Sequence, residues 1–301
     1  MGTDIISSEF RKRARNGEYE GLDKEKEGEW NGSFMFIQGA DCQYGMIDDM
    51  AEKTPIRWEE EIKMTRIAID KINQMKPKPK FFAVCGDLVH AFPGEEGRTE
   101  QEQDFAREFS RLDPSIPLVC CCGNHDVGNK PTPQSIQRFR DTVGDDYFSF
   151  WAGGVKCLVL NSQYYEDSSL VKEMSEKQNE WLDRELNGKC RQGCKHLITF
   201  QHIPWFLKHP DEGNDYFNID RNVRSKMLEK LHKAGVKTVF CGHYHRNAGG
   251  FYKGMEEVVT SAMGCPLGTE KSGLRVVTVT ESGINHKYYA MDDIPLSFEL
   301  D

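Results

Sequence analysis

Polar residues that can bind metal ions follow five separate apolar runs of this chain. The five clusters are Asp41-Cys42-Gln43, Gly86-Asp87, Gly123-Asn124-His125-Asp126, His202 and Gly242-His243-Tyr244-His245. Each preceding run has the length and composition of a buried β-strand. In open α/β sheets, ligands bind at the carboxyl ends of the strands. The five clusters are therefore expected to meet at one edge of a sheet and to form a metal site.

Amphipathic helices are expected between the apolar runs. Apolar or small residues recur at i, i+4, i+7, i+11 and i+14 in one segment: Trp58, Ile62, Thr65, Ile69 and Ile72. This spacing is typical of a helix with one buried face. Similar patterns predict helices near residues 101–112, 176–186 and 222–234. Strands that alternate with helices indicate parallel pairing with right-handed crossovers.

Two regions depart from this alternation. Residues 147–151 and 155–160 flank Gly153-Gly154 and predict a hairpin, and residues 257–260, 274–280 and 284–289 predict a closing antiparallel set. Two mixed sheets packed face to face, with helices on both outer sides, accommodate both patterns. The predicted fold class is α/β, as a four-layer αββα sandwich.

The predicted site determines the domain organisation. Its clusters span most of the 301 residues, so a division in the middle of the chain would split the site. We therefore expect one domain over residues 31–292, preceded by a charged tail over 1–30 and followed by a short tail over 293–301. The alternation Lys24-Glu25-Lys26-Glu27 and the lack of apolar periodicity support the N-terminal tail.

Charge and composition exclude several classes of partner. The formal net charge of −9 disfavours nucleic acid, because proteins that bind phosphate backbones usually carry a basic face. No run approaches the roughly 20 apolar residues of a membrane span. Most of the ten cysteines lie inside apolar runs, where reduced cysteine is a small hydrophobe. With no apolar signal segment in residues 1–15, a cytoplasmic protein with free thiols is expected.

The residue types of the clusters suit phosphoryl chemistry. Two divalent cations about 3.5–4 Å apart can clamp the attacking and leaving oxygens of an in-line phosphoryl displacement. A carboxylate is the natural bridge between two such cations, since it offers two anionic oxygens. The clusters supply carboxylates, amides and imidazoles, so a metal-dependent hydrolase is expected.

The five clusters, in this order, resemble the motifs of the calcineurin-like metallophosphoesterase superfamily, over roughly residues 34–290. The longer segments 36–41 (Phe-Ile-Gln-Gly-Ala-Asp) and 241–250 (Cys-Gly-His-Tyr-His-Arg-Asn-Ala-Gly-Gly) resemble an animal branch of that family. The members of this branch are classed as cytosolic serine/threonine phosphatases. The resemblance implies a dinuclear-metal phosphomonoesterase whose substrate is a phosphorylated protein. We also expect the protein to be a monomer.

The resemblance also implies a role for each motif residue. Asp87 would bridge the metals; Asp41, Gln43 and His245 would complete the first site, and Asn124, His202 and His243 the second. A hydroxide bridging the two metals would then attack phosphorus in line. His125, next to Asn124, is the candidate general acid, and a catalytic or supporting role is expected of Asp126. Arg246, just past His245, is a candidate phosphate clamp, for which an exposed loop arginine is an equal alternative.

Gln43 departs from the family pattern, in which a histidine usually stands two residues after the first aspartate. An amide oxygen is a harder and neutral donor, so Mn²⁺ or Mg²⁺ is favoured, with iron or zinc possible. A branch of manganese-dependent nucleotide pyrophosphatases resembles this Asp-x-Gln form. A phosphodiesterase or nucleotide pyrophosphatase therefore stays open as an alternative. A non-catalytic metal-binding scaffold is a second alternative, and a nuclease is disfavoured by the acidic charge.

Overall fold

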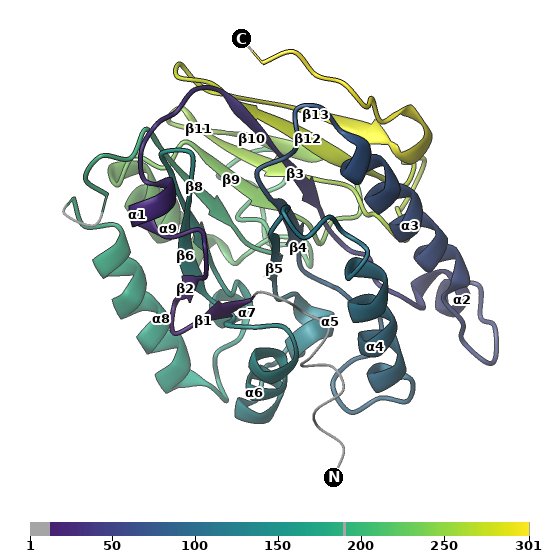
Figure 1. Cartoon of the computed structure of the whole chain (residues 1–301). Helices are drawn as coiled ribbons and strands as arrows, with labels where there is room; N and C mark the ends of the chain where they lie inside the picture. The colour runs from purple at the N-terminus through teal and green to yellow at the C-terminus, as the bar shows by residue number, and fades with distance from the viewer. Residues whose placement is uncertain (1–12, 189–190, 301) are drawn as a thin grey trace.

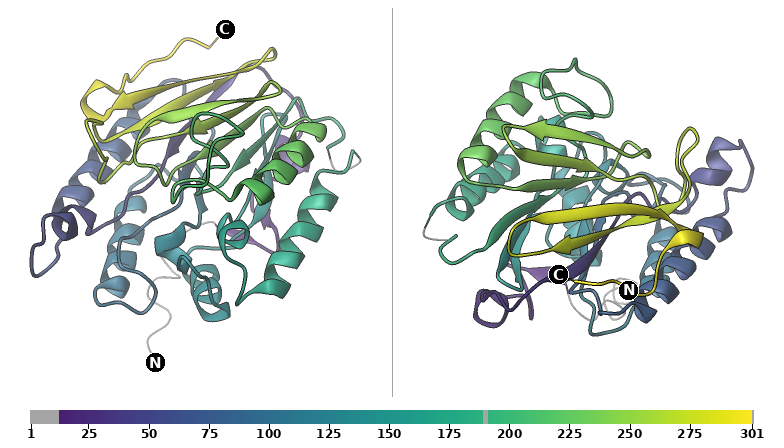
Figure 2. Two further views of the ribbon diagram at one scale, coloured as in Figure 1. Left: turned by 180° about the vertical axis from the view of Figure 1, so that it is seen from behind. Right: turned by 90° about the horizontal axis from the view of Figure 1, so that it is seen from above.

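The computed structural model describes residues 13–188 and 191–300 and contains two β-sheets packed face to face. One sheet has eight strands in the order β1-β2-β6-β7-β8-β9-β11-β10, and the other has five in the order β13-β12-β3-β4-β5. Helices cover the outer face of each sheet (Figures 1 and 2). The predicted four-layer αββα sandwich is confirmed.

Parallel pairing brings the carboxyl ends of six central strands to the same side. In the five-stranded sheet β3, β4 and β5 are parallel neighbours, and in the eight-stranded sheet β7, β8 and β9 are parallel neighbours. The strands are β1 Ala14–Arg15, β2 Glu18–Tyr19, β3 Phe34–Gly39, β4 Phe82–Cys85, β5 Leu118–Cys121, β6 Phe148–Ala152, β7 Val155–Val159, β8 His196–Phe200, β9 Thr238–Cys241, β10 Ala248–Tyr252, β11 Met255–Val259, β12 Gly273–Val279 and β13 Ile284–Ala290.

Aromatic rings fill the space between the sheets. Phe36 of β3 stacks on Phe81 with 4.5 Å between ring centroids. The same ring meets Phe200 of β8 and Phe240 of β9 edge-on, at 5.7 and 5.5 Å. The next residue, Ile37, faces the opposite side and packs under the helices. Because successive side chains of β3 point to opposite faces, this strand contributes both to the core between the sheets and to the core beneath the helices.

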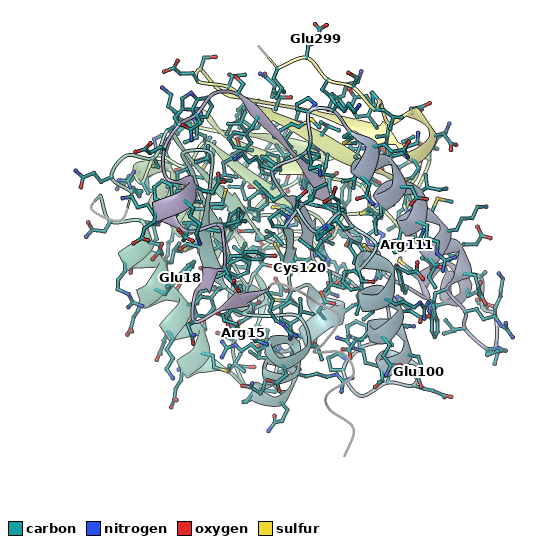
Figure 3. All side chains as sticks on the ribbon, in the orientation of Figure 1. Arg15, Glu18, Glu100, Arg111, Cys120 and Glu299 are labelled. Carbon is teal, nitrogen blue, oxygen red and sulfur yellow. The ribbon has the colours of Figure 1, made fainter. Side chains whose placement is uncertain are left out.

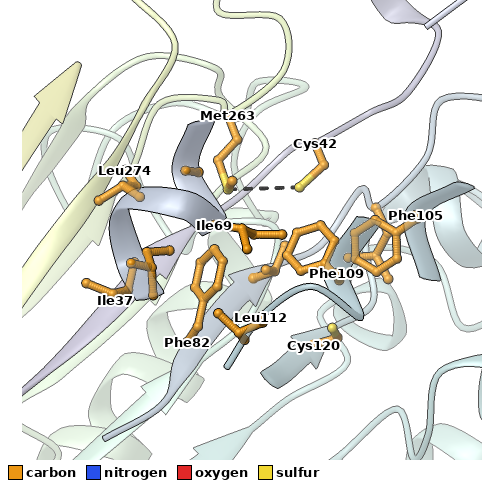
Figure 4. Packing of buried hydrophobic residues seen from close by; sticks show 14 of the residues in the cluster. Ile37, Cys42, Ile69, Phe82, Phe105, Phe109, Leu112, Cys120, Met263 and Leu274 are labelled. Atoms are coloured by element: carbon orange, nitrogen blue, oxygen red, sulfur yellow. Dashed lines mark hydrogen bonds between the residues drawn. The ribbon is translucent and has the colours of Figure 1, made fainter. Parts of the chain in front are cut away.

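The outer layers are amphipathic helices with one apolar face against a sheet. Ile69 of α3 and Phe105 and Phe109 of α4 pack on Ile37 and Phe82 of the five-stranded sheet (Figure 4). Helices α8 and α9 cover the eight-stranded sheet. The helices are α1 Lys24–Glu27, α2 Met46–Met50, α3 Glu59–Gln74, α4 Arg98–Phe109, α5 Asn124–Val127, α6 Pro133–Thr142, α7 Gln163–Glu166, α8 Lys172–Glu185 and α9 Arg221–Lys233, with a 3₁₀ turn at Met291–Asp293.

The structure differs from the predicted tails. Strand β2 pairs with β6 in parallel, and Tyr19 and Leu22 are buried at the end of the inter-sheet core. Near the C-terminus, Phe298 N–H donates to Lys76 O at 2.8 Å. Residues 13–30 and 293–300 therefore pack against the domain. Residues 1–12 of the predicted N-terminal tail lie outside the described residues.

The predicted closing antiparallel set is partly wrong. Strands β12 and β13 pair antiparallel as expected. Strand β11, however, belongs to the other sheet, where it pairs in parallel with β9 and antiparallel with β10. The sequence of β10 contains Gly249 and Gly250, and this weak strand signal concealed the hairpin partner of β11.

Replacing Leu22 tests whether the N-terminal segment belongs to the folded domain. We expect Leu22→Ala to lower the free energy of unfolding by about 2–3 kcal/mol, the scale of a buried leucine truncation, because Leu22 is only 4% exposed. Urea denaturation followed by circular dichroism measures the change. Glu20→Ala, at an exposed position two residues away, is the control. Equal stabilities for the two variants would contradict the packing of this segment.

Candidate metal centre

Side chains from both sheets converge on the carboxylate of Asp87. Ligand atoms of Asp87, His202 and His243 lie within 4.8 Å of one another, and those of Asp41, Asp87 and His245 form a second such group. All five residues are buried. They follow the carboxyl ends of β3, β4, β8 and β9. The residues brought together by the fold are those expected from the strand-end motifs, and Asp87 is common to both groups.

The backbone at these strand ends is unusual. Eight non-glycine residues of the described chain have positive φ, and five of them are candidate ligands. These five are Asp41 (53°), Gln43 (42°), Asp87 (50°), His243 (68°) and His245 (55°). Left-handed backbone is costly for residues with a Cβ, and it clusters at functional sites when the surrounding structure enforces it. In this chain its concentration at five candidate ligands indicates a constrained functional site.

Two motif glycines allow the ligand loops to approach one another. A Cβ on Gly123 would lie 2.2 Å from Oδ1 of Asp87, and a Cβ on Gly86 would lie 2.4 Å from Nδ1 of His202. Both distances are far below a van der Waals contact. The Gly-Asp and Gly-Asn pairs of the sequence therefore reflect close packing between neighbouring loops.

Each candidate histidine ligand donates one ring N–H to a backbone carbonyl and directs its other nitrogen to the cluster. His202 Nδ1 is 2.8 Å from Cys85 O, His243 Nε2 is 3.0 Å from Tyr216 O, and His245 Nδ1 is 2.6 Å from Cys265 O. Such outer hydrogen bonds fix the tautomer and the ring orientation of metal-binding histidines. The opposite nitrogens, when deprotonated, offer lone pairs suited to a cation.

The two amide side chains also fit a metal site. Gln43 is 2% exposed, and its Oε1 has no hydrogen-bond partner among the described residues. A buried acceptor without a partner is costly, and a bound cation would satisfy it. Oδ1 of Asn124 lies 3.0 Å from Nε2 of His202, within the second group. The donor set of carboxylate, amide and imidazole groups thus fits two hard or borderline divalent ions.

The electrostatics of the cluster favour positive charge. Burial opposes ionisation of Asp87, but the charges of His202 and His125 outweigh it and hold its pKa well below the ordinary range. Burial alone would lower the pKa of His202, yet Asp87 and Asp41 raise it to about 10. Burial and the neighbouring His202 lower the pKa of His243 to about 3. Asp87 and Asp41, which stabilise the protonated form of His202, would attract a metal cation in the same way.

His125 borders the cluster on helix α5. Its backbone N–H donates to Asp87 Oδ1 at 2.8 Å, and its Nδ1 forms a short hydrogen bond with His90 O. Its ring stacks with two others, His90 at 4.9 Å and Phe92 at 4.1 Å between centroids. These contacts leave Nε2 as the nitrogen free for proton exchange.

Asp126 joins two ligand loops. Its carboxylate accepts from Leu88 N at 3.0 Å and from Gly123 N at 2.7 Å. Burial and the charge of Asp87 raise the pKa of Asp126 to about 7. Arg98, which no sequence pattern indicated, donates to the carbonyls of His125 and Asp126 at 2.6 and 3.0 Å. Together these groups hold α5 against the loop that carries Asp87.

Two further residues lie near the cluster. Arg246 lies over the ring of Tyr244 at 4.9 Å and donates to Tyr244 O, and its role as a phosphate clamp stays a prediction. Tyr216, which the sequence did not single out, is 60% exposed, and its hydroxyl accepts from Asn124 Nδ2 at 3.4 Å. Tyr216 follows the acidic segment 211–215, whose composition is typical of a solvated loop.

Two buried groups of candidate metal ligands that share a carboxylate, on the facing edges of an αββα sandwich, are the arrangement expected of a metallophosphoesterase. The sequence profile of the calcineurin-like phosphoesterase family matches residues 51–247. The chain belongs to this family.

Known proteins support this assignment along most of the chain. "Serine/threonine-protein phosphatase CPPED1" of Bos taurus is 50% identical over 286 residues, which cover 94% of this chain and 91% of the relative. The Homo sapiens protein of the same name is 49% identical over 287 residues, with the same two coverages. A crystal structure titled as a dimetal phosphatase from Danio rerio has a TM-score of 0.57 at 16% identity, covering 86% of this chain and all of that chain.

Removing the charge of Asp87 tests its shared position. We expect Asp87→Asn to reduce bound Mn²⁺ from two ions per chain to fewer than one, because both groups lose their common anionic ligand. Inductively coupled plasma mass spectrometry after dialysis measures the content. Asp70→Asn, at an exposed position on α3, is the control. Retention of two ions by Asp87→Asn would contradict the shared carboxylate.

Restoring the usual family residue tests the role of Gln43. We expect Gln43→His to shift metal preference from Mn²⁺ toward Zn²⁺ or iron, because imidazole is a softer donor than an amide oxygen. Competition between equal concentrations of Mn²⁺ and Zn²⁺, read by metal content, measures the preference. An unchanged ratio would show that the amide does not set selectivity.

Proposed function

We propose that this protein is a dinuclear metal-dependent serine/threonine-protein phosphatase. The observation that carries the proposal is the position of Asp87, which belongs to both buried groups of candidate ligands. Relatives that cover 94% of the chain and bear the name serine/threonine-protein phosphatase support the substrate class.

The candidate ligands divide into two sets that share Asp87. Asp41, Gln43 and His245 would hold one cation, and Asn124, His202 and His243 the other. When bound, the two cations supply an acidified water and neutralise the charge of the phosphate group. Mn²⁺ or Mg²⁺ suits the oxygen-rich first set, and iron or zinc is the alternative.

His125 would act as the general acid. Its backbone N–H donates to Asp87, which fixes the imidazole beside the shared carboxylate. Its Nδ1 is held by His90 O, so a proton carried on Nε2 can pass to the departing serine or threonine oxygen. Asp126 would be a positioning residue, since it joins the loops of Asp87 and Asn124 without facing the substrate side.

The proposal extends to the cellular setting, for which the composition gives support. We propose a cytoplasmic monomer that acts on a phosphorylated protein and has no nucleic-acid or membrane partner. The net charge of −9 supports the first exclusion. No helix in residues 13–188 or 191–300 is long and apolar enough to span a bilayer.

Phosphate release by the purified protein tests the proposal. The substrates are a phosphoserine peptide, an aryl phosphodiester and ADP-ribose, each assayed with and without Mn²⁺. We expect manganese-dependent hydrolysis of the peptide and its loss in Asp87→Asn. Cleavage of only the diester or ADP-ribose would replace the proposed substrate class, and no turnover with two metals bound would favour a scaffold.

A leaving-group series tests the role of His125. We expect His125→Ala to lower kcat by about 10²–10⁴-fold on phenyl phosphate while metal content stays at the wild-type level, because no proton is delivered to the leaving oxygen. The loss should be smaller on p-nitrophenyl phosphate, whose leaving group needs little protonation. An equal loss on both esters, or a loss of metal, would contradict the role.

A further inference from the structure

A groove with a volume of about 680 Å³ opens beside the metal centre. One wall is the connection between α2 and α3, with Ile56 and Trp58, and the other is the loop between β4 and α4, with His90. None of the candidate metal ligands lines it. The groove is therefore a feature additional to the site that binds the phosphate.

The groove begins next to the proposed general acid. The His90 ring, which lines the groove, packs nearly parallel to the His125 ring at 4.9 Å. The leaving group of a phosphoester departs at His125. In a phosphorylated protein that leaving group is the serine or threonine side chain, so the adjoining peptide would extend into this side of the site.

Five of the fourteen residues that line the groove carry carboxylates: Asp49, Glu52, Glu95, Glu96 and Glu100. Of these, Asp49 lies 3.2 Å from His90 Nε2. The one lysine, Lys53, is engaged by Asp48 at 2.6 Å. Within the described ranges, no cationic side chain lies within ion-pair distance of Glu96 or Glu100, and Glu100 points outward from the end of α4 (Figure 3). The groove thus has negative charge that the chain itself leaves uncompensated.

A buried amide in the same lining indicates a peptide ligand independently of the charge. Gln101 is 2% exposed, and its Oε1 accepts from His90 N at 3.1 Å and from Ala91 N at 2.8 Å. Its Nε2 has no acceptor in the part of the chain that the structure describes, and it is not among the fully enclosed atoms, so it is open to a ligand in the groove. A peptide carbonyl is an acceptor suited to such a donor.

We propose that this groove is a substrate subsite that binds a lysine or arginine side chain near the phosphorylated serine or threonine. The acidic rim provides the charge complement, and Gln101 provides a donor for the peptide backbone. This inference rests on the proposed phosphatase activity, and it adds that basic residues near the phosphorylated residue distinguish the preferred substrates.

Matched phosphopeptides test the subsite. One peptide carries two arginines beside the phosphoserine, a second carries two glutamates and a third two alanines. Each kcat/KM is divided by that for phenyl phosphate, which has no peptide to fill the groove, so that general losses of activity cancel. We expect the arginine peptide to exceed the alanine peptide by about threefold to tenfold, the scale of one or two exposed ion pairs, mainly through KM.

Charge reversal on the rim locates the effect. We expect the double variant Glu96→Lys/Glu100→Lys to lose the preference for arginine and to gain one for glutamate. The control is Glu173→Lys/Glu180→Lys on α8, which makes the same change in net charge at exposed positions, one of them also in a first helical turn. Helices α4 and α8 lie on opposite sides of the molecule (Figures 1 and 2).

The outcomes distinguish a failure of the proposed subsite from a failure of the proposed phosphatase activity. Equal ratios for the three peptides on the wild-type protein would overturn the subsite while leaving the phosphatase in place. Equal effects of the two double variants would also overturn it, because the preference would then come from overall charge. Failure to hydrolyse phenyl phosphate and all three peptides would instead overturn the proposed function.

Discussion

Asp87 carries a carboxylate that is 1% exposed and lies where the two sheets of the sandwich meet. A buried anion without compensation costs several kcal/mol, so the surrounding structure is organised to offset it. The His125 backbone N–H and the His202 ring both approach its oxygens, at 2.8 and 3.3 Å. The left-handed backbone at the ligands and the closely approached glycines follow from the same requirement, because ligands from both sheets must reach one small volume.

The sequence predicted much of this arrangement for a simple physical reason. Parallel strands deliver their carboxyl ends to one edge, so a polar residue just after an apolar run has a known place in the fold. This holds for Asp41, Asp87, Asn124, His202 and His243. The helices α3, α4, α8 and α9 were predictable as well, since their apolar faces repeat with helical spacing.

Other features left no usable signal along the chain. Strands β1 and β2 are two residues long and join the sheet through the pairing of β2 with β6, which local composition does not reveal. The carbonyls that orient the histidines belong to the backbone, which every residue has. The acidic groove combines residues 49–58 with residues 90–101, and only the tertiary structure brings these segments together.

Anomalous diffraction from crystals soaked in Mn²⁺ would locate the metal ions relative to Asp87. We expect two anomalous peaks per chain, about 3.5–4 Å apart, with the Asp87 carboxylate between them and with Gln43 beside one and Asn124 beside the other. A single peak, or two peaks of which one lies away from Asp87, would contradict a shared carboxylate as the basis of the site.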